Sequence, residues 1–311
     1  MYEQIARNKR RSIAYTVLFV LVWLAIGIAI GLLVAGGTPP TAAARWRDAS
    51  AGAAFAAVFA FGAVVFALTS GRQLVLSVAG AVPADPREFP QLCDLVEALA
   101  IGDGLPVPDV YVVADPSPNA FATGISPDRA AVTVTTVLLA VMDREELEGV
   151  LGHELSHIKN YDTRLLLVVT TLIGLAGLLA SIAWRAGLFV RPRGRNGEQF
   201  TIVVLVAGAL LAVVGFVVGP IVRLALSRRR ESLADASSVQ LTRNPVGLIR
   251  ALRQLQANDL PLQRMNHATA CMCIDDPLQH HRGALQRLFD THPPIAERIA
   301  TLELMAQGLS I

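Results

Sequence analysis

Residues 12–44 of this 311-residue chain carry no charged side chain, and this run limits the fold more than any other feature of the sequence. An α-helix rises about 1.5 Å per residue, so the apolar stretch at 13–36 is long enough to cross a hydrocarbon core of roughly 30 Å. Further apolar runs of spanning length lie at 51–71, 165–184 and 200–222. Hydrophobic residues make up 53% of the chain and charged residues only 17%. The sequence therefore predicts a mainly α membrane protein with about four transmembrane helices.

The segments between and after these runs resemble soluble protein, because they carry most of the Asp, Glu, Pro and His residues. We divide the chain into an N-terminal membrane anchor (1–82), a first soluble half (83–163), a transmembrane hairpin (164–222) and a second soluble half (223–311). The two soluble halves are expected to form one soluble domain that is split by the second helical hairpin.

Basic residues near the ends of the apolar runs predict the orientation. RNKRR at 7–11 precedes the first run, whereas the loop before the second run holds only Arg45 and Arg47. The positive-inside rule therefore places the N-terminus and the soluble halves in the cytoplasm. The same rule would also keep inside the four arginines at 185–195, in the loop between the last two runs. A full hairpin and a shallow or re-entrant pair of helices both stay open.

Charge and cysteine content exclude some classes of partner. The formal net charge is +2, and neither interleaved aromatic residues nor a basic recognition helix indicates nucleic acid. Cys93 stands alone, and Cys271 and Cys273 form a C-x-C pair without a second pair, which is a weak metal or redox signal. Reduced thiols in a cytoplasmic domain are the simpler interpretation.

The segment 152–160, GHELSHIKN, lies in an expected helix. Asp143 and Glu146 form a capping-box pattern at its start. At about 100° per residue, one face of this helix is apolar, formed by Leu147, Val150, Leu151, Leu155 and Ile158. Polar residues lie on the other side: Lys159, Glu145, Glu148, Ser156 and Asn160. Glu154 falls inside the apolar face, and His153 and His157 lie together at its border.

Burying the carboxylate of Glu154 costs several kcal/mol unless a cation compensates it. His153 and His157, four residues apart, project from one face with the spacing of two zinc ligands. Glu154 lies one step round the helix, close to any water on such a metal. We interpret this H-E-x-x-H pattern as a catalytic zinc site; the alternative is a pair of core histidines with a buried salt bridge.

A catalytic zinc requires a third protein ligand, and the next histidine after His157 is His267. The best candidate lies in an expected helix just after the fourth apolar run. Glu231 and Asp235 are four residues apart there, hence on one face. Glu231 could bind the metal while Asp235 accepts the free ring N–H of a ligand histidine. The alternative is a set of i, i+4 salt bridges to Arg228 or its neighbours.

Four motifs together, GHELSHIKNYDT, RRRESLAD, PNAFATG and THPPIAERI, resemble the HtpX family of membrane zinc metalloproteases, relatives of the CAAX-prenyl-protein endopeptidases. The resemblance covers most of the chain and implies a zincin-like α+β metalloprotease domain with one Zn²⁺ per subunit. It implies that His153, His157 and Glu231 bind zinc and that Glu154 is the base. It also implies a bacterial inner-membrane endopeptidase with a cytoplasmic catalytic face, which acts in stress-linked quality control of misfolded or damaged membrane proteins.

The resemblance also bears on a predicted strand region. Residues 108–124 contain two short extended runs around a Pro/Ser/Asn turn, and 130–142 begins as a third strand. A strand beside the active helix can bind a substrate as an added strand. The candidates for this contact are Asn119, Ala120 and Phe121; a plain hairpin turn is the alternative for Asn119.

The expected chemistry is metal-assisted peptide hydrolysis. Glu154 takes a proton from the zinc-bound water and delivers it to the leaving amine. His292 could donate to the oxyanion of the substrate, as its counterpart is thought to do in similar enzymes, or it could belong to a helix-capping segment. Two other functions stay open: a prenyl-protein-type endopeptidase and a non-catalytic, zinc-stabilised membrane scaffold or chaperone subunit.

The expected partners follow from this chemistry and from the apolar helices. They are membrane-protein or unfolded polypeptide substrates and the lipid bilayer, with a homo-oligomer or association with other quality-control proteases as further candidates. Nucleic acid is not expected.

Overall fold

The structure is a computed structural model that describes residues 2–34, 41–189, 197–213, 228–257 and 294–307. The chain divides into two compact units, which we describe separately. The mixed unit contains the sheet and comprises Met1–Lys9, Gly71–Leu167 and Val222–Ile311. The helical unit comprises Arg10–Ser70 and Val168–Ile221.

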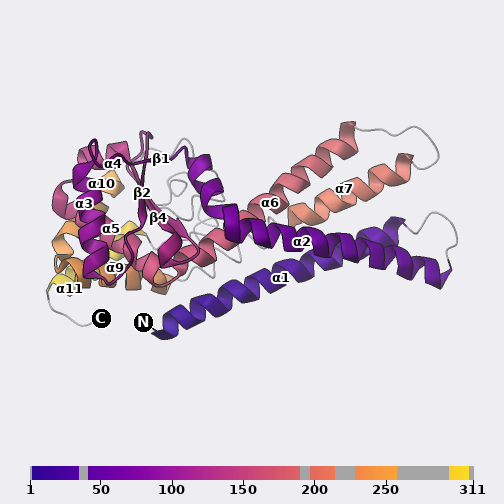
Figure 1. The fold of residues 1–311 in the computed structure, drawn as a ribbon, viewed down its shortest axis with the longest axis horizontal. Helices are drawn as coiled ribbons and strands as arrows, with labels where there is room; N and C mark the ends of the chain where they lie inside the picture. The colour runs from indigo at the N-terminus through magenta and orange to yellow at the C-terminus, as the bar shows by residue number, and fades with distance from the viewer. Residues whose placement is uncertain (1, 35–40, 190–196, 214–227, 258–293, 308–311) are drawn as a thin grey trace. The chain divides into compact units, whose positions relative to one another are not determined.

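The helical unit takes its described residues from four helices (Figure 1), which are α1 (Tyr2–Val34), α2 (Ala42–Ala79), α6 (Asp162–Phe189) and α7 (Gly197–Val213). In the described part of the chain, three segments are long and apolar enough to cross a membrane: Ile5–Leu32, Ala42–Ala79 and Asp162–Arg185. The prediction of a mainly α protein with membrane helices is confirmed. The predicted span at 200–222 is described only as far as Val213, and its apolar part there is the shorter segment Thr201–Ala212.

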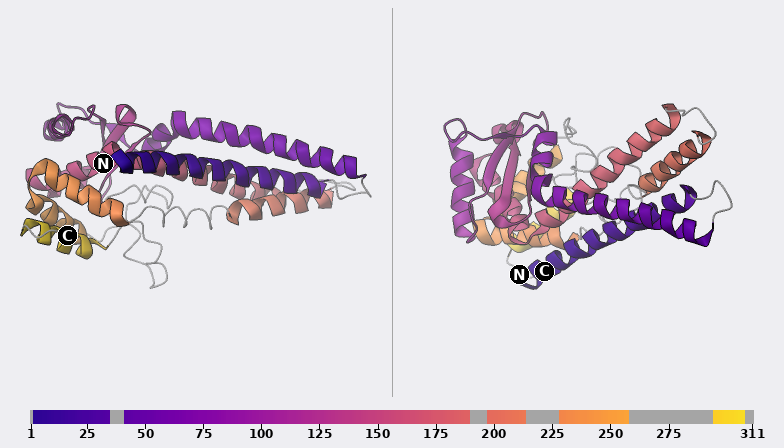
Figure 2. Two further views of the ribbon diagram at one scale, coloured as in Figure 1. Left: turned by 90° about the horizontal axis from the view of Figure 1, so that it is seen from below. Right: turned by 45° about the vertical axis from the view of Figure 1, so that its right-hand side comes forward.

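These helices extend beyond the apolar runs that predicted them. The second run ends at residue 71, whereas α2 continues to Ala79. Apolarity marks the part of a helix that suits lipid, while the backbone stays helical as long as good helix formers follow. The four helices run alongside one another (Figure 2). One apolar cluster takes residues from all four, including Trp23, Ala60, Leu172 and Leu211. Other large apolar side chains of α2 are exposed, such as Phe55 and Val58, as expected for a surface that faces lipid.

The mixed unit contains a four-stranded sheet in the order β1-β2-β4-β3. Its strands are β1 (Val82–Pro83), β2 (Asp109–Val113), β3 (Ala120–Gly124) and β4 (Ala130–Thr135). The central pair β2 and β4 is parallel, and both outer pairs are antiparallel. The extended runs predicted in 108–124 and at the start of 130–142 are confirmed. Within the described residues β3 has a strand neighbour on one side only.

Helix α5 (Arg144–Lys159) is the centre of the mixed unit and is buried from Glu146 to Ile158, with the exception of Glu148. It contacts β3, β4 and three further helices: α3 (Pro90–Gly102), α9 (Arg228–Thr242) and α10 (Pro245–Ala257). Helix α11 (Ile295–Ala306) packs on α9 and α10. The predicted capping box is confirmed, since the Asp143 side chain accepts from the Glu146 N–H and the Glu146 carboxylate accepts from the Asp143 N–H.

Gly149 allows α5 to approach its neighbours closely. A Cβ atom added there would lie 2.8 Å from the backbone nitrogen of Leu248 in α10. On the other side, Ser238 Oγ in α9 donates a 2.7 Å hydrogen bond to the Gly149 carbonyl. A side chain at this position would therefore push two helix backbones apart.

We expect Gly149→Ala to destabilise the protein by about 1–3 kcal/mol, because overpacking between helix backbones outweighs the better helix propensity of alanine. The measurement is the Tm of the purified protein in detergent. Gly102→Ala is the matched control, because its added Cβ would meet only Leu241 Cδ1, at an ordinary 3.5 Å. An unchanged Tm for Gly149→Ala would contradict the close approach described here.

Candidate metal centre

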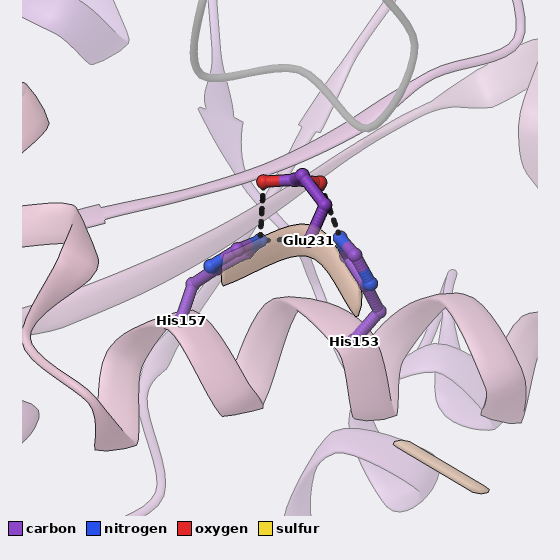
Figure 3. Close-up of side chains that lie close together, drawn as sticks. All are labelled: His153, His157 and Glu231. Carbon is purple, nitrogen blue, oxygen red and sulfur yellow. Dashed lines mark hydrogen bonds and ion pairs between the residues drawn. The ribbon is translucent and has the colours of Figure 1, made fainter. Parts of the chain in front are cut away.

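Three side chains from two helices converge on one point in the mixed unit (Figure 3). His153 and His157 come from successive turns of α5, and Glu231 comes from the first turn of α9. One potential ligand atom of each lies within 4.8 Å of the others. The two Nε2 atoms are 3.1 Å apart. Glu231 Oε2 lies 3.5 Å from Nε2 of His153, and Oε1 lies 3.6 Å from Nε2 of His157. The structure thus brings together the three residues that the sequence nominated as metal ligands.

Each histidine contacts a carboxylate through its other ring nitrogen. Nδ1 of His153 lies 2.9 Å from Asp235 Oδ1, the contact that the sequence predicted for Asp235. Nδ1 of His157 lies 3.1 Å from Oδ2 of Asp162, the first residue of α6, which the sequence analysis missed. A carboxylate can only accept, so each pair keeps a proton on Nδ1 and directs the lone pair of Nε2 towards the other ligand atoms.

This donor set fits a metal ion. Two imidazole lone pairs and a carboxylate are all electron donors, and placing them together in a buried site is unfavourable without a cation. His153 is fully buried, and His157 and Glu231 are 9% and 7% exposed. Two histidines and a glutamate form a ligand set of catalytic zinc sites, in which a further position is left for water. His153, His157 and Glu231 are thus the residues that would hold a metal ion.

The pKa values of the two histidines and of Asp235 also show that this site favours positive charge on the histidines. Burial, and then the nearby Arg298, act to lower the pKa of His153, but the hydrogen bonds to Asp235 and Glu231 outweigh them and raise it to about 9. Burial also opposes the charged form of His157, yet Glu231 and Asp162 raise its pKa. Burial alone would raise the pKa of Asp235, whereas Arg298 and His153 lower it to about 2. Without a metal, protons satisfy the site.

Arg298, in α11, is a further residue that the sequence analysis missed. It is 3% exposed, and its Nε and Nη2 donate to the two carboxylate oxygens of Asp235 at 3.0 and 2.7 Å. This bidentate ion pair places the positive charge of Arg298 next to the Asp235 carboxylate, which contacts His153. The Asp235 carboxylate thus pairs with a residue of another helix, whereas the sequence offered local pairs with Arg228 as the alternative. The only indication of Arg298 in the sequence was that Asp235, expected to face inward, would need a positively charged partner.

Glu154 follows His153 in α5 and is 1% exposed. Its burial agrees with the helical periodicity, which placed it inside the apolar face of α5. Its role as the base stays a prediction.

The proposed substrate strand is present as an edge of the described sheet. Asn119 immediately precedes β3, its backbone exchanges hydrogen bonds with Thr135, and its side chain accepts from the Ala120 N–H. The Asn119 side chain thus shapes the entry to β3. The strands before and after this segment, β2 and β3, do not pair with each other, so the segment is not the hairpin turn that the alternative expected. Ala120 and Phe121 are buried in β3, at 0% and 4% exposed. Substrate binding by these three residues stays a prediction, and His292 lies outside the described residues.

Comparisons with known proteins agree with this geometry. The profile of Peptidase family M48 matches residues 86–306. The protease HtpX homolog of Streptococcus gordonii is 40% identical over 312 residues, with 98% of this chain and 100% of that protein covered. The homolog of Levilactobacillus brevis is 41% identical over 310 residues, with 98% and 100% covered.

A solved structure shares the fold. The crystal structure of S. mikatae Ste24p superposes with a TM-score of 0.50 at 21% sequence identity. The match covers 79% of this chain but only 57% of that protein, and at this identity it concerns the fold alone. From the family profile and the nearly full-length relatives, the chain belongs to peptidase family M48 and, within it, to the HtpX membrane proteases.

Proposed function

We propose that this membrane protease is a zinc-dependent endopeptidase that hydrolyses peptide bonds of misfolded or damaged membrane proteins at the cytoplasmic face of a bacterial inner membrane. One observation carries the zinc assignment. Three ligand atoms converge in a buried site, and the Nδ1 atom of each histidine contacts a carboxylate. Such carboxylate–histidine pairs are the usual outer contacts of protein zinc sites.

The roles of the residues follow from their positions. Bound zinc would lower the pKa of a water molecule and polarise the scissile carbonyl. Glu154, buried beside His153, would accept a proton from the attacking water and pass it to the leaving amine. Asp235 and Asp162 keep the Nδ1 protons in place and orient the two rings. Arg298 holds Asp235 ionised, so that the His153 ring keeps its orientation.

Chain connectivity supports a membrane-anchored substrate. Helix α5 ends at Lys159, and the candidate span α6 begins at Asp162. The metal-binding helix is therefore joined to a membrane helix by two residues, which ties the catalytic residues to the bilayer surface. A polypeptide that is itself held in the membrane would meet such a site without diffusing through bulk solvent. Orientation towards the cytoplasm is supported by the basic RNKRR segment at the start of α1.

We expect Glu154→Gln to keep zinc and to lower the rate of casein cleavage at least ~100-fold, the usual contribution of a general base. Glu231→Ala should lose both zinc and cleavage. Zinc content and casein cleavage are measured side by side on protein purified in detergent. Glu148→Gln, the same change on the partly exposed side of α5, is the control that should keep both.

The same experiment separates this proposal from its alternatives. Cleavage by Glu154→Gln at nearly the wild-type rate would show that Glu154 is not the general base. A wild-type protein that binds zinc and cleaves no polypeptide would favour the non-catalytic scaffold. Cleavage confined to prenylated peptides would favour the prenyl-protein-type endopeptidase.

Zinc binding should depend on pH. The pKa of His153 is raised from 6.5 to about 9 in the metal-free protein, so its proton stabilises that fold fully below pH 6.5 and is lost as the pH rises through about 9. Zinc must displace this proton. The pKa of His157 is raised as well, so zinc must displace its proton too. We therefore expect the apparent zinc affinity to rise at least about tenfold per pH unit up to about pH 9, measured by chelator competition. An affinity that stays constant between pH 7 and 8.5 would contradict the raised pKa.

The orientation can be tested with single cysteines in a chain whose three native cysteines are replaced by serine. Arg87→Cys, in the exposed segment before α3, should react with a membrane-impermeant maleimide in inverted vesicles but not in spheroplasts. Arg47→Cys, on the exposed first turns of α2, should show the reverse. The opposite pattern for the pair would overturn the cytoplasmic assignment.

A further inference from the structure

The turn that joins α5 to α6 has an unusual backbone. Tyr161 adopts a φ of 60°, in the left-handed region that non-glycine residues rarely occupy. It is flanked by Asn160, the C-cap residue of α5, and by Asp162, which contacts His157. A conformation of this kind persists only where surrounding contacts hold it. The Tyr161 N–H donates to the Ile158 carbonyl of α5, and further contacts come from the first residues of the chain.

Asn8, on the first turns of α1, is 1% exposed and lies against this turn. Its side-chain amide donates one hydrogen bond of 2.8 Å to the Asn160 carbonyl and another of 2.7 Å to Asp162 Oδ1. An amide nitrogen has two N–H groups, so both are used. Asn8 thus bridges the residues on either side of Tyr161. All of these residues belong to the mixed unit.

The next residue of α1 contacts the strained residue itself. Lys9 places its ammonium group 4.2 Å from the centre of the Tyr161 ring, within the range of a cation–π interaction. Two successive residues of α1 therefore bind three successive residues of the turn. The N-terminal segment is thus a structural part of the turn that follows the metal-binding helix.

The Asp162 carboxylate is the point where these contacts meet the metal site. Its Oδ1 accepts from Asn8 at 2.7 Å and from Arg230 Nη1 at 3.0 Å. Its Oδ2 faces His157 Nδ1 at 3.1 Å. Arg230 directly precedes Glu231, so this buried carboxylate contacts one proposed ligand and the neighbour of another.

We propose that Asn8 is a positioning residue for the metal site: through Asp162 it fixes the His157 ring, so that the start of α1 becomes part of the zinc site. The proposal rests on the proposed function, since it takes zinc as the ligand of His157. Its physical basis is the orientation of one carboxylate. Arg230 alone contacts Oδ1 from one side, and the Asn8 amide supplies the second contact that stops the carboxylate from turning away from His157.

The test uses the full-length protein purified in detergent and compares wild type with Asn8→Ala, Asn8→Asp, Asp162→Asn and the double variant Asn8→Ala/Asp162→Asn. Zinc affinity is measured by chelator competition, and the geometry of the site by the visible spectrum of the cobalt-substituted protein. We expect Asp162→Asn to weaken zinc binding about 10- to 100-fold, the usual effect of losing the partner of a ligand histidine. Asn8→Ala should weaken it about tenfold and change the cobalt spectrum.

The double variant distinguishes positioning from general support. If Asn8 acts through Asp162, the double variant should bind zinc about as weakly as Asp162→Asn alone, because the two effects are coupled. Arg7→Gln, at the exposed neighbouring position on α1, is the control and should bind zinc like wild type. Asn8→Asp keeps the shape of the side chain but points a carboxylate at Asp162, so its loss should be at least as large as that of Asn8→Ala.

The outcomes separate the two proposals. Wild type without zinc affinity would overturn the proposed function and this inference with it. The inference alone would be overturned if wild type binds zinc and cleaves casein, and if Asn8→Ala and Asn8→Asp bind zinc as tightly as wild type. Fully additive losses in the double variant would also overturn it. A loss of zinc affinity in the Asn8 variants that comes with a lower Tm of the metal-free protein would also overturn it, because this would show general destabilisation.

Discussion

The structure depends on the burial of two histidines whose Nε2 atoms lie 3.1 Å apart and face a carboxylate. Each histidine is backed by an aspartate, and each aspartate by an arginine: Asp235 by Arg298, and Asp162 by Arg230. The carboxylates of Asp235, Asp162 and Glu231 raise the pKa values of the two histidines, so without a metal ion the histidines take up protons. A bound cation would supply this positive charge in place of the protons.

Local patterns in the sequence were sufficient for the metal-binding helix and for its ligands. A capping box and a 3.6-residue period depend only on neighbours along the chain, so Asp143, Glu146 and the buried face of α5 could be read directly. Glu231 and Asp235 followed from their i, i+4 spacing and from the need for a third ligand. The strands β2, β3 and β4 were marked by short extended runs with turn residues between them.

Apart from Asp235, the residues that support the ligands could not be predicted in this way, because they come from distant parts of the chain. Asn8, Asp162 and Arg298 lie on three different helices, and nothing in their local sequence distinguishes them from solvated polar residues. The polar side of α5 shows the same limit, since Ser156 and Asn160 are buried. Helical periodicity identifies which residues share a face, but tertiary packing decides whether that face is covered. The parallel pairing of β2 with β4, with β3 at the edge, likewise depends on topology.

Because of the position of the ligands in the chain, a bound metal would stabilise the fold as well as take part in the chemistry. His153 and His157 precede the apolar segments of α6 and α7, whereas Glu231 follows them, so the ligand set joins the two sequence halves of one domain. Metal affinity in such a site contributes directly to the stability of the fold, because the separated halves cannot present all three ligands. The contact between α5 and α9 is partly independent of metal, since Ser238 bonds to Gly149. A metal ion would therefore bind between helices that already contact each other, and would add to the stability of that contact.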